Sequence, residues 1–456
     1  MRSVFTIIAL TIGSVSASAD FEAGVAVIDI TPKPGLKSWG YGPSAPEMTG
    51  TLDPLHARAL ILRVPGKTLA LVTLDLGRVP LTDACGRIRE RVRPLGVDEV
   101  IFTASHTHQA PPMDVDAPHT RKIEEKIGDA IEKALKTMRP ATIGVGRTTI
   151  DIASNRRKIL EDGQCMMVWR NAEQVPMGPV DHEAGIVKIA DDAGNLIAVL
   201  VNYACHPVVL SWDNTKYSAD YVGEMARVVK EESGAECLFL QGGSGDINPY
   251  LDKTPVNEGG IEAMRNVGRT AGYAVLAALE GIEAKKPANP SIATVTKRVT
   301  VGSRWDVSKP EAQAVLKAAY GEAGFNKYLA KLTPDFSVPV TVALLNGDLA
   351  LACVPGEFFV QYQLDLKNLS PVKNTFMVGY ANEFHVYFPT IKDSVARGYG
   401  AAMNTYVGAG AGDRVLTESL LEIGRLMGKL SLDPVREDFV LHEGNARDTA
   451  PANTEN

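Results

Sequence analysis

One pattern recurs along this chain of 456 residues and constrains its fold: apolar strands that end in polar, chemically reactive side chains. Each instance is a short apolar run followed by a break, usually rich in glycine or proline. In α/β sheets, ligands bind in the crevice outside the carboxyl ends of strands. The pattern therefore predicts an α/β protein with a functional site at such an edge. The side chains placed in this way are Asp75, His106, His108, His206, Asp246, Asn248, Glu357 and Tyr387.

The periodicity of the rest of the chain agrees with this fold class. Apolar residues recur at helical spacing from Thr120 to Met138, and further helices are expected over 260–279 and 414–430. No internal repeat or low-complexity linker divides the sequence. We expect a single large catalytic domain over residues 20–430, with a mixed β-sheet core flanked by α-helices. A polar extension over 431–456 is expected to be partly disordered.

Residues 1–19 have the features of a secretory signal peptide. A positive start at Arg2 precedes an apolar run over 4–15, and the segment ends in the small residues Ala17-Ser18-Ala19. The sequence contains no other apolar stretch of about 18 residues, so no integral membrane segment is expected. We therefore expect a secreted or periplasmic protein.

Composition excludes some classes of partner. The net charge is −7 and no long cluster of lysine and arginine is present, which argues against nucleic acid. The five cysteines include no C-x-x-C pair and are interpreted as small core residues, although an exported protein permits a disulfide. A small-molecule substrate is the expected partner. The sequence does not indicate the oligomeric state.

The segment Ser105-His106-Thr107-His108 follows an apolar strand and carries the strongest chemical signal. Residues i and i+2 of an extended chain point to the same side, so both imidazoles face one way. Together with His206 and Glu357, they predict a Zn²⁺ site in which His106, His206 and Glu357 are ligands and one position stays open. His108 is either a further ligand or a neighbouring acid or base. The structural alternatives are hydrogen-bonded core histidines and a glutamate at a helix N-terminus.

Two other segments are candidates for substrate binding. Gly243 and Ser244 belong to a glycine-rich turn whose backbone N–H groups can bind an anion. Arg156 can hold a carboxylate or a phosphate. The alternatives are an ordinary tight turn and a solvated charge.

In combination, these segments resemble the neutral/alkaline ceramidase family of zinc-dependent amide hydrolases. The resemblance covers residues from about 21 to about 430, the catalytic domain of that family. It implies Zn²⁺ held by His106, His206, Glu357 and Tyr387, with His108 beside it and Asp246 among the catalytic groups. The matching segments are Asp29-Ile30-Thr31-Pro32, Ser105-His106-Thr107-His108, the strand into His206, Ser218-Ala219-Asp220-Tyr221, Gly245-Asp246 with Pro249, Val354-Pro355-Gly356-Glu357, and Asn382 with Tyr387.

The chain departs from the family pattern at several points. Asn248 stands where the family motif Gly-Asp-Val-Ser-Pro has a catalytic serine, and Phe384 takes the first tyrosine position of Asn-x-Tyr-x-x-Tyr. Tyr380 is therefore an alternative to Tyr387. An amide cannot act as a nucleophile, but it can donate a hydrogen bond to an oxyanion. The β-sandwich domain that follows the catalytic domain in ceramidases is not expected here.

The sequence thus predicts a zinc-dependent hydrolase that cleaves an amide (N-acyl) or related acyl bond by a metal-activated water, with a substrate other than ceramide. One alternative is a metal-binding, non-catalytic ligand-binding protein on the same scaffold, because the serine is missing. Another is a metal-dependent esterase, lactonase or phosphoesterase. A two-metal phosphoesterase would need Asp75 and Asp246 as part of a second ligand set.

Overall fold

The computed structural model describes residues 21–115, 117–329 and 332–431. The predicted signal peptide lies outside the described residues, as does nearly all of the predicted C-terminal extension. None of the described helices has both the length and the hydropathy that a membrane span requires.

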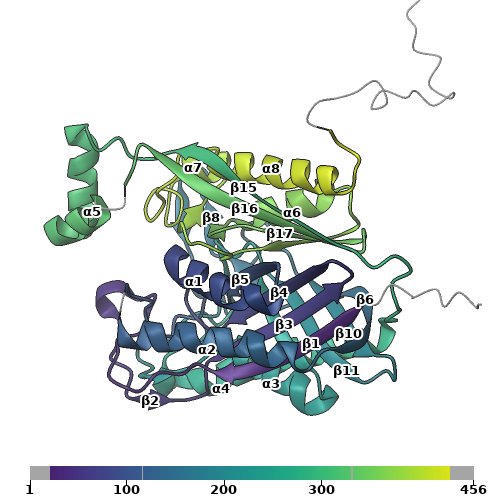
Figure 1. Cartoon of the computed structure of the whole chain (residues 1–456). Helices are drawn as coiled ribbons and strands as arrows, with labels where there is room; N and C mark the ends of the chain where they lie inside the picture. The colour runs from purple at the N-terminus through teal and green to yellow at the C-terminus, as the bar shows by residue number, and fades with distance from the viewer. Residues whose placement is uncertain (1–20, 116, 330–331, 432–456) are drawn as a thin grey trace, which may run out of the picture.

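The larger sheet has eight strands in the order β13-β11-β10-β6-β1-β3-β4-β5 (Figure 1). Neighbouring strands are antiparallel, except that β4 pairs with β5 and β11 pairs with β13 in parallel. The sheet is therefore mixed, as expected. Its strands are β1 (Glu22–Asp29), β3 (His56–Val64), β4 (Lys67–Leu74), β5 (Glu99–Ala104), β6 (Arg139–Thr149), β10 (Glu183–Asp191), β11 (Leu196–Tyr203) and β13 (Glu236–Gln241).

A smaller, four-stranded sheet has the order β15-β16-β17-β19. It packs on the larger sheet through a shared apolar cluster to which both contribute, for example Leu71 and Leu200 from one and Leu351 and Phe376 from the other. The sequence patterns did not predict that these strands form a separate sheet. They are β15 (Ile292–Gly302), β16 (Asp335–Leu345), β17 (Leu349–Cys353) and β19 (Asn374–Val378).

Helices cover the outer face of each sheet, so the layers run helix, sheet, sheet, helix (Figure 1). The expectation of a mixed sheet core flanked by helices in one domain is confirmed. On the larger sheet lie α1 (Thr82–Val92), α2 (Pro118–Leu135), α3 (Asp220–Ser233) and α4 (Gly260–Gly281); on the smaller sheet lie α6 (Val360–Leu369) and α8 (Ala411–Leu426).

Shorter elements complete the fold, and α5 (Pro310–Leu329) extends away from the body of the molecule (Figure 1). The others are β2 (Gly50–Thr51), β7 (Ala153–Asn155), β8 (Arg157–Ile159), β9 (Cys165–Met167), β12 (Lys216–Tyr217), β14 (Ile247–Pro249), β18 (Glu357–Phe358), β20 (Tyr387–Phe388), α7 (Ile391–Ala396), and the 3₁₀ helices η1 (Gly42–Ser44), η2 (Arg93–Leu95) and η3 (Val256–Glu258).

The two edges of the larger sheet approach each other. The side-chain amide of Gln241, at the end of β13, donates to the carbonyl oxygen of Ser105, just after β5, over 2.9 Å. The segment after β19 lies in the same place, because the N–H of Gly379 donates to the Gln241 carbonyl at 2.7 Å. Strand twist accumulates across a sheet of this size. As a result, loops that follow strands at opposite edges of the sheet meet at one point.

We predict that Gly185→Ala destabilises the contact between the sheets. A Cβ at Gly185 in β10 would lie 2.3 Å from the ring of Phe376 in β19. Overpacking of this kind costs about 1–3 kcal/mol, measurable as a lower midpoint of urea unfolding. The matched control is Gly86→Ala in α1, where no atom lies within 4 Å of the added Cβ. The control should leave stability unchanged or raise it by up to about 1 kcal/mol. Equal effects of both substitutions would contradict the prediction.

Candidate metal centre

His106 and His206 follow strands β5 and β11 and are both buried. His106 has a φ of 72°, a left-handed conformation that turns its side chain out of the strand direction. Its Nδ1 lies 2.6 Å from the carbonyl oxygen of Gly77, and Nδ1 of His206 lies 2.6 Å from that of Ser244. A carbonyl oxygen only accepts, so each Nδ1 carries the proton. Each Nε2 is then left with a lone pair, the form in which a histidine binds metal.

Glu357 brings a buried carboxylate to the same point. Its Oε2 lies 3.4 Å from Nε2 of His106 and 3.2 Å from Nε2 of His206. With both Nδ1 atoms protonated, the groups that converge here are lone-pair acceptors. A cation between them would satisfy all of them, so these residues fit a metal ion.

His108 completes a group of three imidazoles. One ring nitrogen from each of His106, His108 and His206 lies within 4.8 Å of the others, so the group is positioned to hold a metal. Burial, followed by the neighbouring histidines, lowers the pKa of His108 well below its ordinary value. Its Nδ1 is buried without a hydrogen-bond partner among the described residues. The arrangement is compatible with both predicted roles, ligand and acid or base.

Each of the two candidate tyrosines neighbours a residue of this candidate metal centre. Tyr387 is paired with Glu357 across β18 and β20, and its hydroxyl accepts a hydrogen bond from Arg156 at 3.2 Å. Tyr380 packs its ring against His106, with centroids 4.2 Å apart, and its hydroxyl contacts Ser244 at 3.0 Å. Burial raises the pKa of both hydroxyls well above the ordinary value, and Glu357 raises them further. Tyr387 therefore remains a proposal for the metal site.

Asn248 and Arg156 belong to one buried chain of hydrogen bonds. Nη1 of Arg156 donates to Oδ1 of Asn248 at 3.1 Å, and Nδ2 of Asn248 donates to Asp252 at 2.7 Å. The second nitrogen of Arg156, Nη2, donates to Tyr387 and to the carbonyl of Gly245. The guanidinium is buried between Trp169, Tyr387 and Tyr399. Arg156 is therefore not a solvated charge, and its two terminal nitrogens already have partners.

The other predicted site residues form hydrogen bonds within the protein. Asp246 accepts from Asn155 and from the N–H of Val360 at the start of α6, and burial raises its pKa to about 6. The N–H of Gly243 donates to Gln363 at 2.7 Å. The N–H of Ser244 donates to the carbonyl of Gly242. These contacts leave the turn with few donors for an anion.

Asp75 is likewise engaged in an internal pair. Its Oδ2 accepts from Nη1 of Arg58 at 2.7 Å and from the N–H of His56 at 2.9 Å. Burial would raise the pKa of Asp75, but Arg58 outweighs it and the pKa is lowered. Among the described residues, no second group of ligands with metal-binding spacing accompanies the histidines. A two-metal site is therefore not supported.

Gln241 is a residue of the site that the sequence patterns did not single out. Its Nε2 donates to the carbonyls of Ser105 and Cys205, each at 2.9 Å, and so joins the two loops that carry the histidines. Its Oε1 accepts from the N–H groups of Cys205 and Gly242. The available signal was a polar residue directly after the apolar run 237–240.

Aromatic side chains border the histidines. Trp39 meets the rings of His106 and His108 edge-on, with centroids 5.0 and 5.5 Å apart, and also contacts Phe384. Trp39 lies over Gly77, where an added Cβ would be 2.1 Å from the indole. The hydroxyl of Tyr41 donates to the Leu210 carbonyl at 2.8 Å and anchors this segment. The histidine cluster thus lies beside an apolar, aromatic surface.

Comparison with known proteins bears on the fold. No protein-family model matches the sequence. Among solved structures, neutral ceramidase from Pseudomonas aeruginosa superposes with a TM-score of 0.72 at 16% identity, over 91% of this chain and 76% of that one. The chain has the neutral ceramidase fold. A ceramidase complexed with C2 gives a TM-score of 0.70 at 16% identity, with the same coverage. The predicted resemblance is confirmed at the level of the fold.

We predict that Gln241→Leu loosens the junction of the two histidine loops. The substitution removes the partner of buried carbonyl and N–H groups, and such losses cost about 1–3 kcal/mol each. The free energy of unfolding in urea should fall by about 2–4 kcal/mol. The control is Gln361→Leu on α6, whose amide donates to the neighbouring Asp365 at 2.8 Å. The control should change stability by less than about 0.5 kcal/mol, and a similar loss in both variants would contradict this role of Gln241.

Proposed function

We propose that this protein is a zinc-dependent hydrolase that cleaves an amide (N-acyl) or related acyl bond. The observation that carries the proposal is the convergence of His106, His206 and Glu357 as lone-pair acceptors, with His108 beside them. The ceramidase fold supports the class of bond. The predicted signal peptide supports a secreted or periplasmic location.

Two imidazoles and one carboxylate are the ligand types of catalytic zinc sites. His106, His206 and Glu357 would hold the ion, and Tyr387 is proposed as a fourth contact. When bound, Zn²⁺ supplies a Lewis acid that activates water and polarises a carbonyl group. The carbonyls of Gly77 and Ser244 hold the imidazoles in the required tautomer.

We assign proton transfer to His108. Its Nδ1 lacks a partner among the described residues, so it can take a proton from water and return it to the leaving nitrogen. Trp39 and Phe384 border the histidines and can pack against an acyl or aryl group of the substrate. They also shield the reacting groups from bulk water.

Asn248 is proposed as a positioning residue. Its carbonyl holds Arg156, its amide group holds Asp252, and Arg156 in turn holds the hydroxyl of Tyr387. One amide side chain thus fixes the guanidinium beside the metal site. In this view the reaction needs no side-chain hydroxyl at residue 248.

We predict that removal of either principal ligand abolishes metal binding. His206→Ala and Glu357→Ala should each lower Zn²⁺ affinity by about 100-fold or more, measured by elemental analysis and by competition with a chelator. The control is His182→Ala, a partly exposed histidine near Asp151, which should keep full occupancy. Full occupancy in either ligand variant would show that the ligand set is wrong.

A screen of N-acyl amides, esters and lactones tests the reaction. Wild-type protein should turn over at least one amide, lose that activity with a chelator, and regain it with Zn²⁺. Glu357→Ala should be inactive. Turnover that resists metal removal would refute the zinc mechanism. A clear preference for esters or lactones would support the proposed metal site but show that the bond cleaved is not an amide.

We predict that Asn248→Ser lowers activity although it restores the hydroxyl of the ceramidase motif. Serine is too short to hold both Arg156 and Asp252, so the guanidinium beside Tyr387 loses one of the hydrogen bonds that position it. The value of kcat/KM should fall by about tenfold or more, with metal content unchanged. A rise in kcat/KM would show that the position needs a hydroxyl and that the asparagine lowers catalysis.

A second candidate is a metal-bearing protein that binds its ligand without cleaving it. The observation that favours it is Asn248 itself, because both ends of its amide have partners inside the protein. This candidate predicts full metal content and no turnover in the screen. Metal-dependent turnover of any substrate would exclude it.

A further inference from the structure

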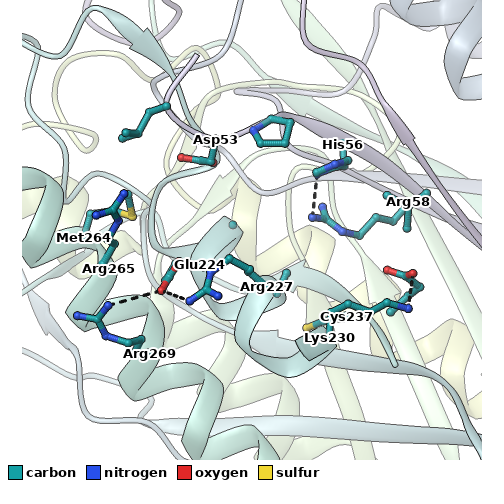
Figure 2. A pocket seen from close by; sticks show the side chains of 16 residues that line it. Asp53, His56, Arg58, Glu224, Arg227, Lys230, Cys237, Met264, Arg265 and Arg269 are labelled. Atoms are coloured by element: carbon teal, nitrogen blue, oxygen red, sulfur yellow. Dashed lines mark hydrogen bonds and ion pairs between the residues drawn. The ribbon is translucent and has the colours of Figure 1, made fainter. Parts of the chain in front are cut away.

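A cavity of about 690 Å³ lies between the start of β3 and helices α3 and α4 (Figure 2). None of its lining residues belongs to the histidine cluster. Sites for small molecules in proteins have volumes of about 300–1,000 Å³. The cavity therefore has the size of a second ligand site, separate from the proposed metal centre.

The charges around this cavity are unequal. Figure 2 shows Glu224 between Arg227 and Arg269, with Arg265 on the same helix as Arg269. Glu224 accepts from Arg227 at 2.7 Å and lies 3.8 Å from Arg269. Among the described residues Arg265 forms no ion pair, yet its charge, with those of Arg227 and Arg269, lowers the pKa of Glu224. The lining as a whole holds five Lys and Arg side chains and three carboxylates, Asp53, Glu224 and Glu236.

The remaining ion pairs of these arginines lie at the rim. Arg227 also pairs with Glu231 and Arg269 with Glu262, whose side chains are 58% and 60% exposed. Ion pairs with exposed partners contribute about 0–1 kcal/mol, so an incoming anion can replace them at little cost. When these two rim glutamates are displaced, the lining keeps an excess of positive charge, although the protein carries a net charge of −7.

The packing of α3 on α4 concentrates these charges. An added Cβ at Gly268 would lie 2.5 Å from Glu224, and one at Gly272 would lie 2.8 Å from Val228. The two glycines therefore let the helices approach closely. Arg265 and Arg269 stand four residues apart on α4, a spacing at which like charges destabilise a helix. An anion between them would remove that repulsion.

Part of the cavity lining is apolar, and we call this part the floor. Leu52, Pro54, Ala226, Cys237 and Met264 line it beside the charged groups. We propose that this cavity binds a small organic anion, with a phosphate or carboxylate held by Arg227, Arg265 and Arg269 and an apolar body on the floor. Guanidinium groups suit this task because their paired N–H groups match the oxygens of both anions. The proposal is independent of the proposed hydrolase activity.

Isothermal titration calorimetry of the full protein with phenyl phosphate, inorganic phosphate and benzoate tests this site. Phenyl phosphate should bind one equivalent with a Kd below about 1 mM, and inorganic phosphate should bind more weakly because it lacks the apolar body. Comparison of benzoate with phenyl phosphate distinguishes the two anionic groups. Arg265→Gln/Arg269→Gln should weaken binding by about tenfold or more.

Two controls test whether the anion binds in this cavity and not elsewhere on the protein. Lys285→Gln/Lys286→Gln removes the same charge from exposed positions outside the cavity and should bind like wild type. His206→Ala should also bind like wild type, because an anion bound at a metal ion would be lost there. The proposal is overturned if wild type binds none of the three probes, if the arginine double variant binds unchanged, or if either control weakens binding equally.

Discussion

The approach of the two edges of the eight-stranded sheet is the constraint on which the site depends. His106 follows a strand at one edge, and His206 follows a strand next to the other. In a flat sheet they would lie several strand spacings of about 4.8 Å apart. Twist brings the edges together, and Gln241 fixes them there by donating to the carbonyls of both histidine loops. The smaller sheet supplies Glu357 from β18, directly after its own strand β17. Three separate strand ends thus meet at one point.

The sequence was sufficient for the general plan because strand ends are local features. An apolar run that stops at His106, His206 or Glu357 is visible without any knowledge of pairing, and the helical spacing from Thr120 onward predicted α2. It was not sufficient for contacts between distant segments. The separate sheet and the junction at Gln241 depend on strand order, which periodicity does not contain. Asp75 and Asp246 also follow strands. For the same reason, the sequence did not indicate that Asp75 pairs with Arg58 or that Asp246 accepts from the start of α6.

The interpretation of Asn248 changes once its neighbours in the structure are known. From the motif alone, the loss of a serine suggests lost catalysis. In the structure the asparagine spans Arg156 and Asp252, a distance that a serine side chain does not cover. The asparagine is therefore part of a buried chain of hydrogen bonds that runs from Asp252 through Arg156 to Tyr387.

Gly77 has two roles that are difficult to separate. Its carbonyl accepts the proton of Nδ1 of His106, and its missing side chain makes room for the indole of Trp39. A displacement of Trp39 by an arriving substrate would press on the same peptide unit that sets the tautomer of the imidazole. The position of Trp39 and the tautomer of His106 are therefore coupled through a single glycine. A shift of the indole would thus act on His106 in two ways, through their direct ring contact and through the carbonyl that accepts from its Nδ1.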